Sequence, residues 1–212
     1  VPGAPGRLGV VVLAGSASML YGADRAGCHS RACGYWFLLA DEGSGYWLGH
    51  QALRAAVRAT DGRGPDTLLQ KLLFDALGVR SVAELIPRVY EKGLPKHRIA
   101  ALASFVQSAH DQGDEVASSL IEGAGRELGL AARSVARQLQ LGDEPFPVVL
   151  AGGVFKGCPS VIDSLTRQLE LHPQPGGPTQ WAIGVFEEHE LAAARTDRAE
   201  FNRNPADPRQ GA

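Results

Sequence analysis

Two apolar runs of the chain end in small residues and have the pattern of strands that are buried on both faces. Residues 8–15 are LGVVVLAG and residues 146–153 are FPVVLAGG. Continuous runs rich in β-branched residues are typical of strands inside a parallel sheet. We therefore predict a strand in each run. A turn of small residues follows the first over 15–18, and a loop follows the second over 154–157.

Other segments predict the rest of a sheet. Residues 24–34 mix charges, glycines and cysteines, which favours a hairpin. The apolar residues 35–39 (YWFLL) predict a further strand, and residues 181–185 predict a last short one.

Helical spacing of apolar residues dominates the rest of the chain. It predicts short helices between residues 67 and 98, and longer ones over 46–58, 99–110, 114–139, 159–171 and 187–195. The helix over 114–139 contains Gly123, Gly125 and Gly129. A glycine inside a helix costs about 1 kcal/mol relative to alanine. Three of them indicate that another part of the molecule lies close against this helix.

The order of these elements predicts the domain organisation. A cluster of strands, a helical middle and a second strand and helix favour a layered α/β domain with a helical insertion at about 61–113. The domain spans 8–195. Residues 1–7 have the Pro/Gly-rich composition of a linker, and we expect the polar, proline-containing tail 196–212 to be mobile.

Composition and charge narrow the function classes. The 212 residues are 44% hydrophobic and 21% charged, with a net charge of -2. This near-neutral balance favours no nucleic-acid partner, and no apolar run has the roughly 20 residues that cross a membrane. Three cysteines form no disulfide framework, so we expect a reducing, cytoplasmic setting. The chain begins at Val1, and we expect a further segment upstream of it.

The two apolar runs also carry the first chemical signal. Small residues at a strand's C-terminal end allow backbone N–H groups to face an anion, and ligands of open α/β sheets bind at such ends. The alternative is that both are tight turns that pack against helices.

Asp41 and Glu42 carry the second signal, since they lie between a predicted strand and a predicted helix. A carboxylate there can cap the helix, or it can accept hydrogen bonds from the hydroxyls of a sugar. Cys28, His29, Cys33 and Cys158 fit no common zinc pattern, so we interpret the thiols as free. We interpret the tryptophans Trp36, Trp47 and Trp181 as core residues.

A longer motif makes the second signal specific. The run ACGYWFLLADEGSGYWLGHQAL, residues 32–53, resembles the signature of N-acetylglucosamine kinases and the wider BadF/BadG/BcrA/BcrD ATPase family, in which GGWG precedes GDEGSxYWIGxxAL. AGSAS at 14–18 is similar to the family's phosphate loop, and LAGGVF at 150–155 to its adenosine-side loop. EGAG at 122–125 is similar to its small-residue helix.

This resemblance implies an actin/hexokinase/Hsp70-like ATPase (ribonuclease H-like) fold and identifies the chain as the C-terminal half of a two-domain kinase. The implied reaction transfers the γ-phosphate of ATP, with Mg²⁺, to a hydroxyl of an amino sugar. The general base would come from a missing N-terminal domain, so the resemblance assigns no catalytic residue and no direct metal ligand to this chain. The nearest string to that domain's phosphate loop, Asp61-Gly62-Arg63-Gly64, follows a predicted helix, and we interpret it as a turn.

The resemblance also implies site residues. The implied phosphate-binding residues are Gly15, Ser16, Ala17 and Ser18. The implied sugar-binding residues are Cys33, Gly34, Asp41 and Glu42. The implied adenosine-binding residues are Ala124, Gly125, Gly152 and Gly153.

The chain departs from the family pattern at several of these positions. Ala17 replaces a phosphate-loop glycine, Tyr35 and Phe37 replace glycines of GGWG, and Ala40 replaces the glycine before Asp41. Two hypotheses remain: a sugar kinase whose isolated C-terminal half is inactive, or a non-catalytic ATPase-fold module that binds a nucleotide, a sugar or a protein. We expect the face that would meet the missing domain to be apolar and to support a homodimer.

Overall fold

The computed structural model describes residues 8–91, 93–141 and 146–170, together with the backbone of 181–186. The predicted linker 1–7, the predicted helix 187–195 and the predicted tail 196–212 lie outside the described residues.

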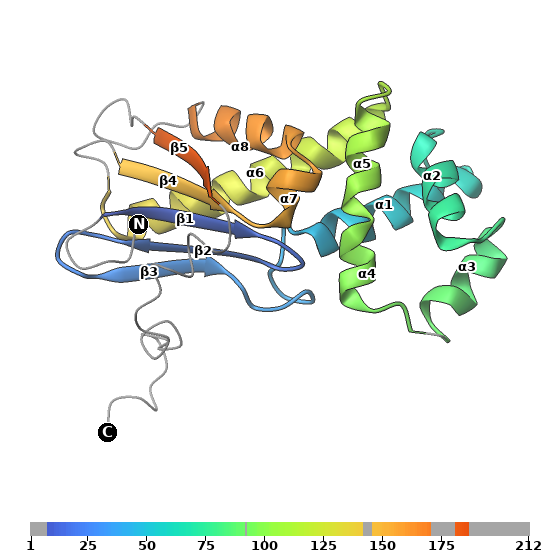
Figure 1. Ribbon diagram of the computed structural model, residues 1–212, viewed down its shortest axis with the longest axis horizontal. Coiled ribbons are helices and arrows are strands. Elements are labelled where there is room, and N and C mark those ends of the chain that lie inside the picture. Colours follow the sequence, from blue (N-terminus) through green and yellow to red (C-terminus); the bar gives the residue numbers. More distant parts are fainter. Residues whose placement is uncertain (1–7, 92, 142–145, 171–180, 187–212) are drawn as a thin grey trace.

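A five-stranded mixed sheet forms one layer of the molecule (Figure 1). Its strands, in the spatial order β3-β2-β1-β4-β5, are β3 His29–Cys33, β2 Ser18–Ala23, β1 Gly9–Ala14, β4 Phe146–Ala151 and β5 Trp181–Phe186. The pairs β1–β2 and β2–β3 are antiparallel, whereas β1–β4 and β4–β5 are parallel. The two buried strands and the hairpin predicted from the sequence are therefore confirmed.

Eight helices follow in chain order within the described residues. They are α1 Gly45–Thr60, α2 Leu68–Leu77, α3 Val82–Val89, α4 Lys96–Ala101, α5 Ala103–His110, α6 Glu115–Gln138, α7 Gly153–Gly157 and α8 Ser160–Glu170. Helix α6 packs on β1, β2 and β3, and α8 lies beside α6. Helices α1 to α5 lie beyond the end at which β1 and β4 finish (Figure 1). The segment 61–113 holds α2 to α5, as expected for a helical region.

The glycines of α6 lie where other elements approach it closely. A Cβ at Gly123 would lie 3.2 Å from the ring of Trp47, and one at Gly129 would lie 2.8 Å from the Gln168 side chain of α8. A Cβ at Gly125 would overlap Ser164 of α8. The prediction that something lies close against this helix is confirmed, and the neighbours are α8 and a side chain of α1.

Asp114 joins the helical region to the sheet layer. Its Oδ1 accepts a hydrogen bond from the Ala117 amide at 2.8 Å and so caps α6. Its Oδ2 accepts from Thr67 Oγ1 at 2.8 Å and from the Leu68 amide at 2.6 Å, at the start of α2. One buried carboxylate therefore fixes the N-termini of two helices against each other.

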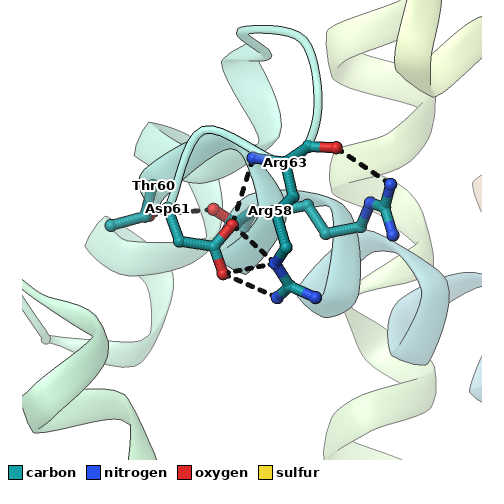
Figure 2. Close-up of polar contacts among 5 residues, drawn as sticks. Arg58, Thr60, Asp61 and Arg63 are labelled. Carbon is teal, nitrogen blue, oxygen red and sulfur yellow. Dashed lines mark hydrogen bonds and ion pairs between the residues drawn. The ribbon is translucent and has the colours of Figure 1, made fainter.

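The string Asp61-Gly62-Arg63-Gly64 is a turn, as predicted. Figure 2 shows that the Asp61 carboxylate accepts hydrogen bonds from the guanidinium of Arg63 and from its backbone amide. Arg58 in turn donates to the Arg63 carbonyl at 2.9 Å. The Asp61 carboxylate is thus used within the C-terminal cap of α1.

Three sequence predictions are wrong. Residues 35–39 form a turn, because the amides of Leu39 and Ala40 both donate to the Trp36 carbonyl and Trp36 has φ of 70°, outside the strand region. Trp36 is 74% exposed and so lies outside the core. The expected loop 154–157 is the short helix α7, which forms because Val154 and Phe155 both turn into the core.

Candidate nucleotide and sugar site

The ends of β1 and β4 form the floor of the candidate site. The two strands are parallel neighbours, with Leu13 paired to Ala151, so the small residues that follow each strand meet at one edge of the sheet. Gly152 has φ of 116°, and a Cβ there would overlap the backbone of Ala14. Only glycine fits between the strand ends at this position.

A pocket of about 390 Å³ opens at this edge. Its walls come from the β1–β2 turn, the start of α1, the α4–α5 segment and α7. The lining residues are Gly15, Ser16, Gly45, His97, Ala100, Ala101, Ala103, Ser104, Gly153, Val154 and Gly157. Most of them carry no side chain or only a methyl or hydroxymethyl group, so backbone groups make up much of the wall. Such a surface suits an anionic ligand that approaches the backbone closely.

Close packing of α4 against α1 shapes one wall of the pocket. A Cβ at Gly45 would lie 3.1 Å from the Ala100 carbonyl oxygen and 3.2 Å from that of Gly15. The Gly45 amide donates to the Gly15 carbonyl at 2.8 Å. Ser44 caps α1, since its Oγ accepts from the Trp47 amide at 3.1 Å. The capping role considered for Asp41 or Glu42 therefore belongs to Ser44.

The four residues of the predicted phosphate loop divide between two places. Gly15 and Ser16 line the pocket, and Ala17 is exposed beside them. Ala17 does not have a positive φ, so an alanine fits this turn without strain. Ser18 is buried and faces the other way, with its Oγ donating to the Glu42 carbonyl at 2.8 Å and its amide to Asp41 Oδ1 at 3.3 Å.

The predicted sugar residues gather next to this loop. Cys33 and Gly34 end β3 with φ of 60° and 76°, and the Gly34 amide donates to the Ala40 carbonyl at 3.1 Å. Burial, with Glu42 and Asp41 nearby, raises the pKa of the Cys33 thiol to about 11. Cys33 is therefore a neutral thiol at neutral pH.

Asp41 has a partner that the sequence did not reveal. Its side chain is 2% exposed, and its Oδ2 lies 2.7 Å from the Nζ of Lys96, at the start of α4. Because Lys96 is 55 residues away in a polar stretch, no local pattern points to it.

The predicted adenosine residues also divide. Gly153 lines the pocket, and Gly152 precedes it and packs against the backbone of Ala14. Ala124 is fully buried inside α6, and Gly125 packs against α8. Neither lines the pocket. The sequence reasoning missed the wall from the helical region, including His97 and Ser104, because only the fold brings α4 and α5 to the strand ends.

The described residues show no ready-made metal centre. No three or more His, Cys, Asp or Glu side chains among them gather as ligands, and none of the described residues lining the pocket is acidic. The binding of Mg²⁺ therefore stays a prediction, which rests on the need of phosphoryl transfer for charge neutralisation. Within the same described residues, no helix is both long and apolar enough to cross a membrane.

Two proteins are similar to this chain in sequence, and a third is similar in sequence and fold. The chain is 34% identical, over 78% of its length and 54% of the relative's, to an N-acetylmuramic acid/N-acetylglucosamine kinase of Clostridium acetobutylicum. It is 31% identical, over 79% and 53%, to an N-acetyl-D-glucosamine kinase of Dictyostelium discoideum. A Chromobacterium violaceum protein described as a candidate N-acetylglucosamine kinase superposes with a TM-score of 0.63 at 30% identity, over 82% of this chain and 57% of the other.

These matches identify the family of the chain and show how much of the relatives' length the chain covers. The chain spans about half the length of the curated relatives it matches, and the mixed α/β sheet agrees with the fold of its structural neighbour. The sequence model of the BadF/BadG/BcrA/BcrD ATPase family matches residues 1–174. The chain therefore belongs to the BadF/BadG/BcrA/BcrD ATPase family.

Proposed function

We propose that this chain is the nucleotide-binding half of an ATP-dependent kinase that phosphorylates an amino sugar. The observation that carries the proposal is that the pocket at the strand ends lies directly beside a buried carboxylate. A pocket walled by backbone and small residues begins at Ser16, and a buried carboxylate, Asp41, is bonded to the amide of Ser18 two residues later. Two relatives that are named as amino-sugar kinases support the choice of substrate class.

The pocket would hold the nucleotide. Gly15, Ser16 and Gly153 would present backbone groups to the phosphates at the ends of β1 and β4, where ligands of such sheets bind. The helical wall with His97 and Ser104 would flank the rest of the nucleotide. Ala124 and Gly125 would contribute only indirectly, by allowing α6 and α8 to pack closely.

Asp41 would orient the sugar. An ionised carboxylate has about four acceptor sites. The described contacts of Asp41 use two, which would leave two for the hydroxyls of a sugar that reaches this buried carboxylate. Cys33 and Gly34 lie at the end of the neighbouring strand and would border the same sugar. Mg²⁺, when bound, would neutralise charge on the transferring phosphoryl group.

The transfer itself would need groups that these residues do not supply. We propose that a general base and the other wall of the cleft come from the part of the relatives' length that this chain does not span. The chain by itself would then bind ATP weakly, in the millimolar range, which corresponds to about -4 kcal/mol. A cytoplasmic location and a homodimer through the face that would meet the missing domain remain predictions.

Substitution of Asp41 in the full-length protein tests the proposal. We expect Asp41→Asn to raise the KM for N-acetylglucosamine roughly tenfold or more, because a neutral amide accepts hydroxyl hydrogen bonds less strongly than a carboxylate. The KM for ATP should stay within about twofold. Asp66→Asn, at an exposed position in the turn before α2, is the matched control. Unchanged sugar kinetics in Asp41→Asn would refute the role of Asp41.

A further inference from the structure

Lys96 has surroundings that the proposed function does not explain. Its ammonium lies 2.7 Å from Asp41 Oδ2 and 5.4 to 5.6 Å from the ring centroids of Trp36, Phe37 and Tyr46. The Lys96 side chain is 26% exposed, although lysine side chains are usually solvated at the surface. A carboxylate and three aromatic rings therefore surround one cation.

The rings come from two separate elements. Tyr46 belongs to the first turn of α1, whereas Trp36 and Phe37 belong to the turn between β3 and Asp41. Aromatic faces attract a cation within about 6 Å of their centroids. Lys96 thus connects α4 to the turn 34–40 and to α1 at the same time.

The turn 34–40 is held partly by its own hydrogen bonds. They run from Gly34 and Tyr35 to the Ala40 carbonyl, and from Leu39 and Ala40 to the Trp36 carbonyl. The apolar side chains of Leu38 and Leu39 are exposed and do not hold it to the core. Three aromatic contacts help to hold it: Tyr35 lies 4.9 Å from the Arg31 guanidinium, Phe37 lies 5.1 Å from the Tyr46 ring, and Trp36 and Phe37 both face the Lys96 ammonium. Among these contacts, those with Lys96 link the turn to the partner of Asp41.

The Asp41 carboxylate is itself fixed from two sides. One oxygen accepts from the Ser18 amide of β2, and the other accepts from Lys96 of α4. Two donors on two elements set the rotation of the carboxylate, and therefore the direction in which its remaining lone pairs point. An acceptor that is oriented in advance binds a hydroxyl with less loss of freedom.

We propose that Lys96 is a positioning residue of the sugar site, which orients the Asp41 carboxylate and holds the turn 34–40 beside it. This role rests on the proposed function, because it requires Asp41 to accept from a sugar. The opposing explanation is that Lys96 occupies the place of the sugar and must leave before the sugar binds. The two explanations predict opposite effects when the ammonium is removed.

The position of Lys96 also allows a general structural defect to be recognised. The next residue, His97, lines the nucleotide pocket, and so do Ala100 and Ala101 of the same helix. A substitution that displaced α4 would therefore weaken ATP binding too. Loss of sugar binding alone locates the effect at Asp41 and the turn.

Calorimetric titration of the full-length protein tests the role. The titrants are N-acetylglucosamine and, separately, a non-hydrolysable ATP analogue, and the variants are Lys96→Met, Lys96→Arg and Lys71→Met. Lys71 is an exposed residue of α2 and serves as the matched control. We expect Lys96→Met to weaken sugar binding roughly tenfold, about 1.4 kcal/mol. Analogue binding should stay within about twofold. Lys96→Arg keeps a cation that can lie over the aromatic rings and should recover most of the sugar affinity.

Kinetics of the same variants separate orientation from folding. The role predicts a raised sugar KM in Lys96→Met with an ATP KM close to that of the wild type. Tighter or unchanged sugar binding in Lys96→Met would overturn the role and leave the proposed function standing. Parallel losses of sugar and analogue binding would overturn it as well, because they indicate a displaced α4. A wild-type protein that binds no amino sugar would instead refute the proposed function, and the role of Lys96 with it.

Discussion

The pocket proposed for the nucleotide and the group around Asp41 begin two residues apart in the chain, yet they are built in different ways. Ser16 lines the pocket, whose wall is mostly glycine, alanine and serine. Ser18 bonds to Asp41. The Asp41 group consists of Asp41, the Lys96 ammonium and the rings of Trp36, Phe37 and Tyr46. The shape of the pocket is determined by the path of the backbone. The geometry of the Asp41 group is determined by the conformations of long side chains. Substitutions should therefore act on folding in the first region and on recognition in the second.

The largest effect is expected at the floor of the pocket. Gly152→Ala should destabilise the chain by about 3 kcal/mol or more, since the new Cβ overlaps the Ala14 backbone and φ of 116° is strained for any residue with a side chain. Urea unfolding followed by circular dichroism measures the change.

The neighbouring glycine supplies the control. A Cβ at Gly153 meets nothing within 4 Å, and Gly153 begins α7, where alanine favours the helix. Gly153→Ala should therefore change the stability by at most about 1 kcal/mol. Equal losses in the two variants would show that the close approach of Gly152 to Ala14 does not limit which residue fits there.

The secondary-structure elements that flank the pocket could be predicted well from the sequence. The strands β1 and β4 and the helices α1 and α6 follow from apolar runs and helical periods, which are local signals. The family motif then placed Gly15, Ser16 and Gly153 at the pocket that the strand ends form.

Other parts of the molecule depend on backbone turns and contacts that the apolar pattern does not reveal. The five apolar residues 35–39 have the pattern of a strand, but the left-handed φ of Trp36 and the hydrogen bonds to its carbonyl make them a turn. Ser18 belongs to a phosphate motif in the sequence, but the alternation of side chains in β2 turns it toward Asp41. Lys96 has no sequence signal, because its role depends on how α4 docks against α1.

The second prediction separates the two serines that the motif groups together. Ser18→Ala should cost about 1 kcal/mol of stability, because it leaves the part-buried Glu42 carbonyl without its 2.8 Å donor. Ser16→Ala should change the stability by less than about 0.5 kcal/mol, since Ser16 is exposed.

Binding of ATP should show the opposite order. In the full-length protein, Ser16→Ala should weaken ATP binding by roughly threefold if its hydroxyl reaches the phosphates, and Ser18→Ala should leave it unchanged. Thermal unfolding and calorimetric titration of the two variants measure both quantities. A loss of ATP affinity in Ser18→Ala that exceeds the loss in Ser16→Ala would place Ser18 at the nucleotide.

The smallest effect concerns the thiol at the edge of the Asp41 group. Burial first, and then the charges of Glu42 and Asp41, raise the pKa of Cys33 to about 11, and burial raises the pKa of Cys158 to about 12. The thiolate is the reactive form, so both thiols should stay unreactive toward a disulfide reagent at pH 8, while the exposed Cys28 reacts. The reaction of Cys33 should begin only as the pH approaches 11. Cys28→Ser should abolish the fast reaction. If Cys33 instead reacts rapidly at pH 8, the turn 34–40 opens in solution, and the Asp41 group is less ordered in advance than the pocket.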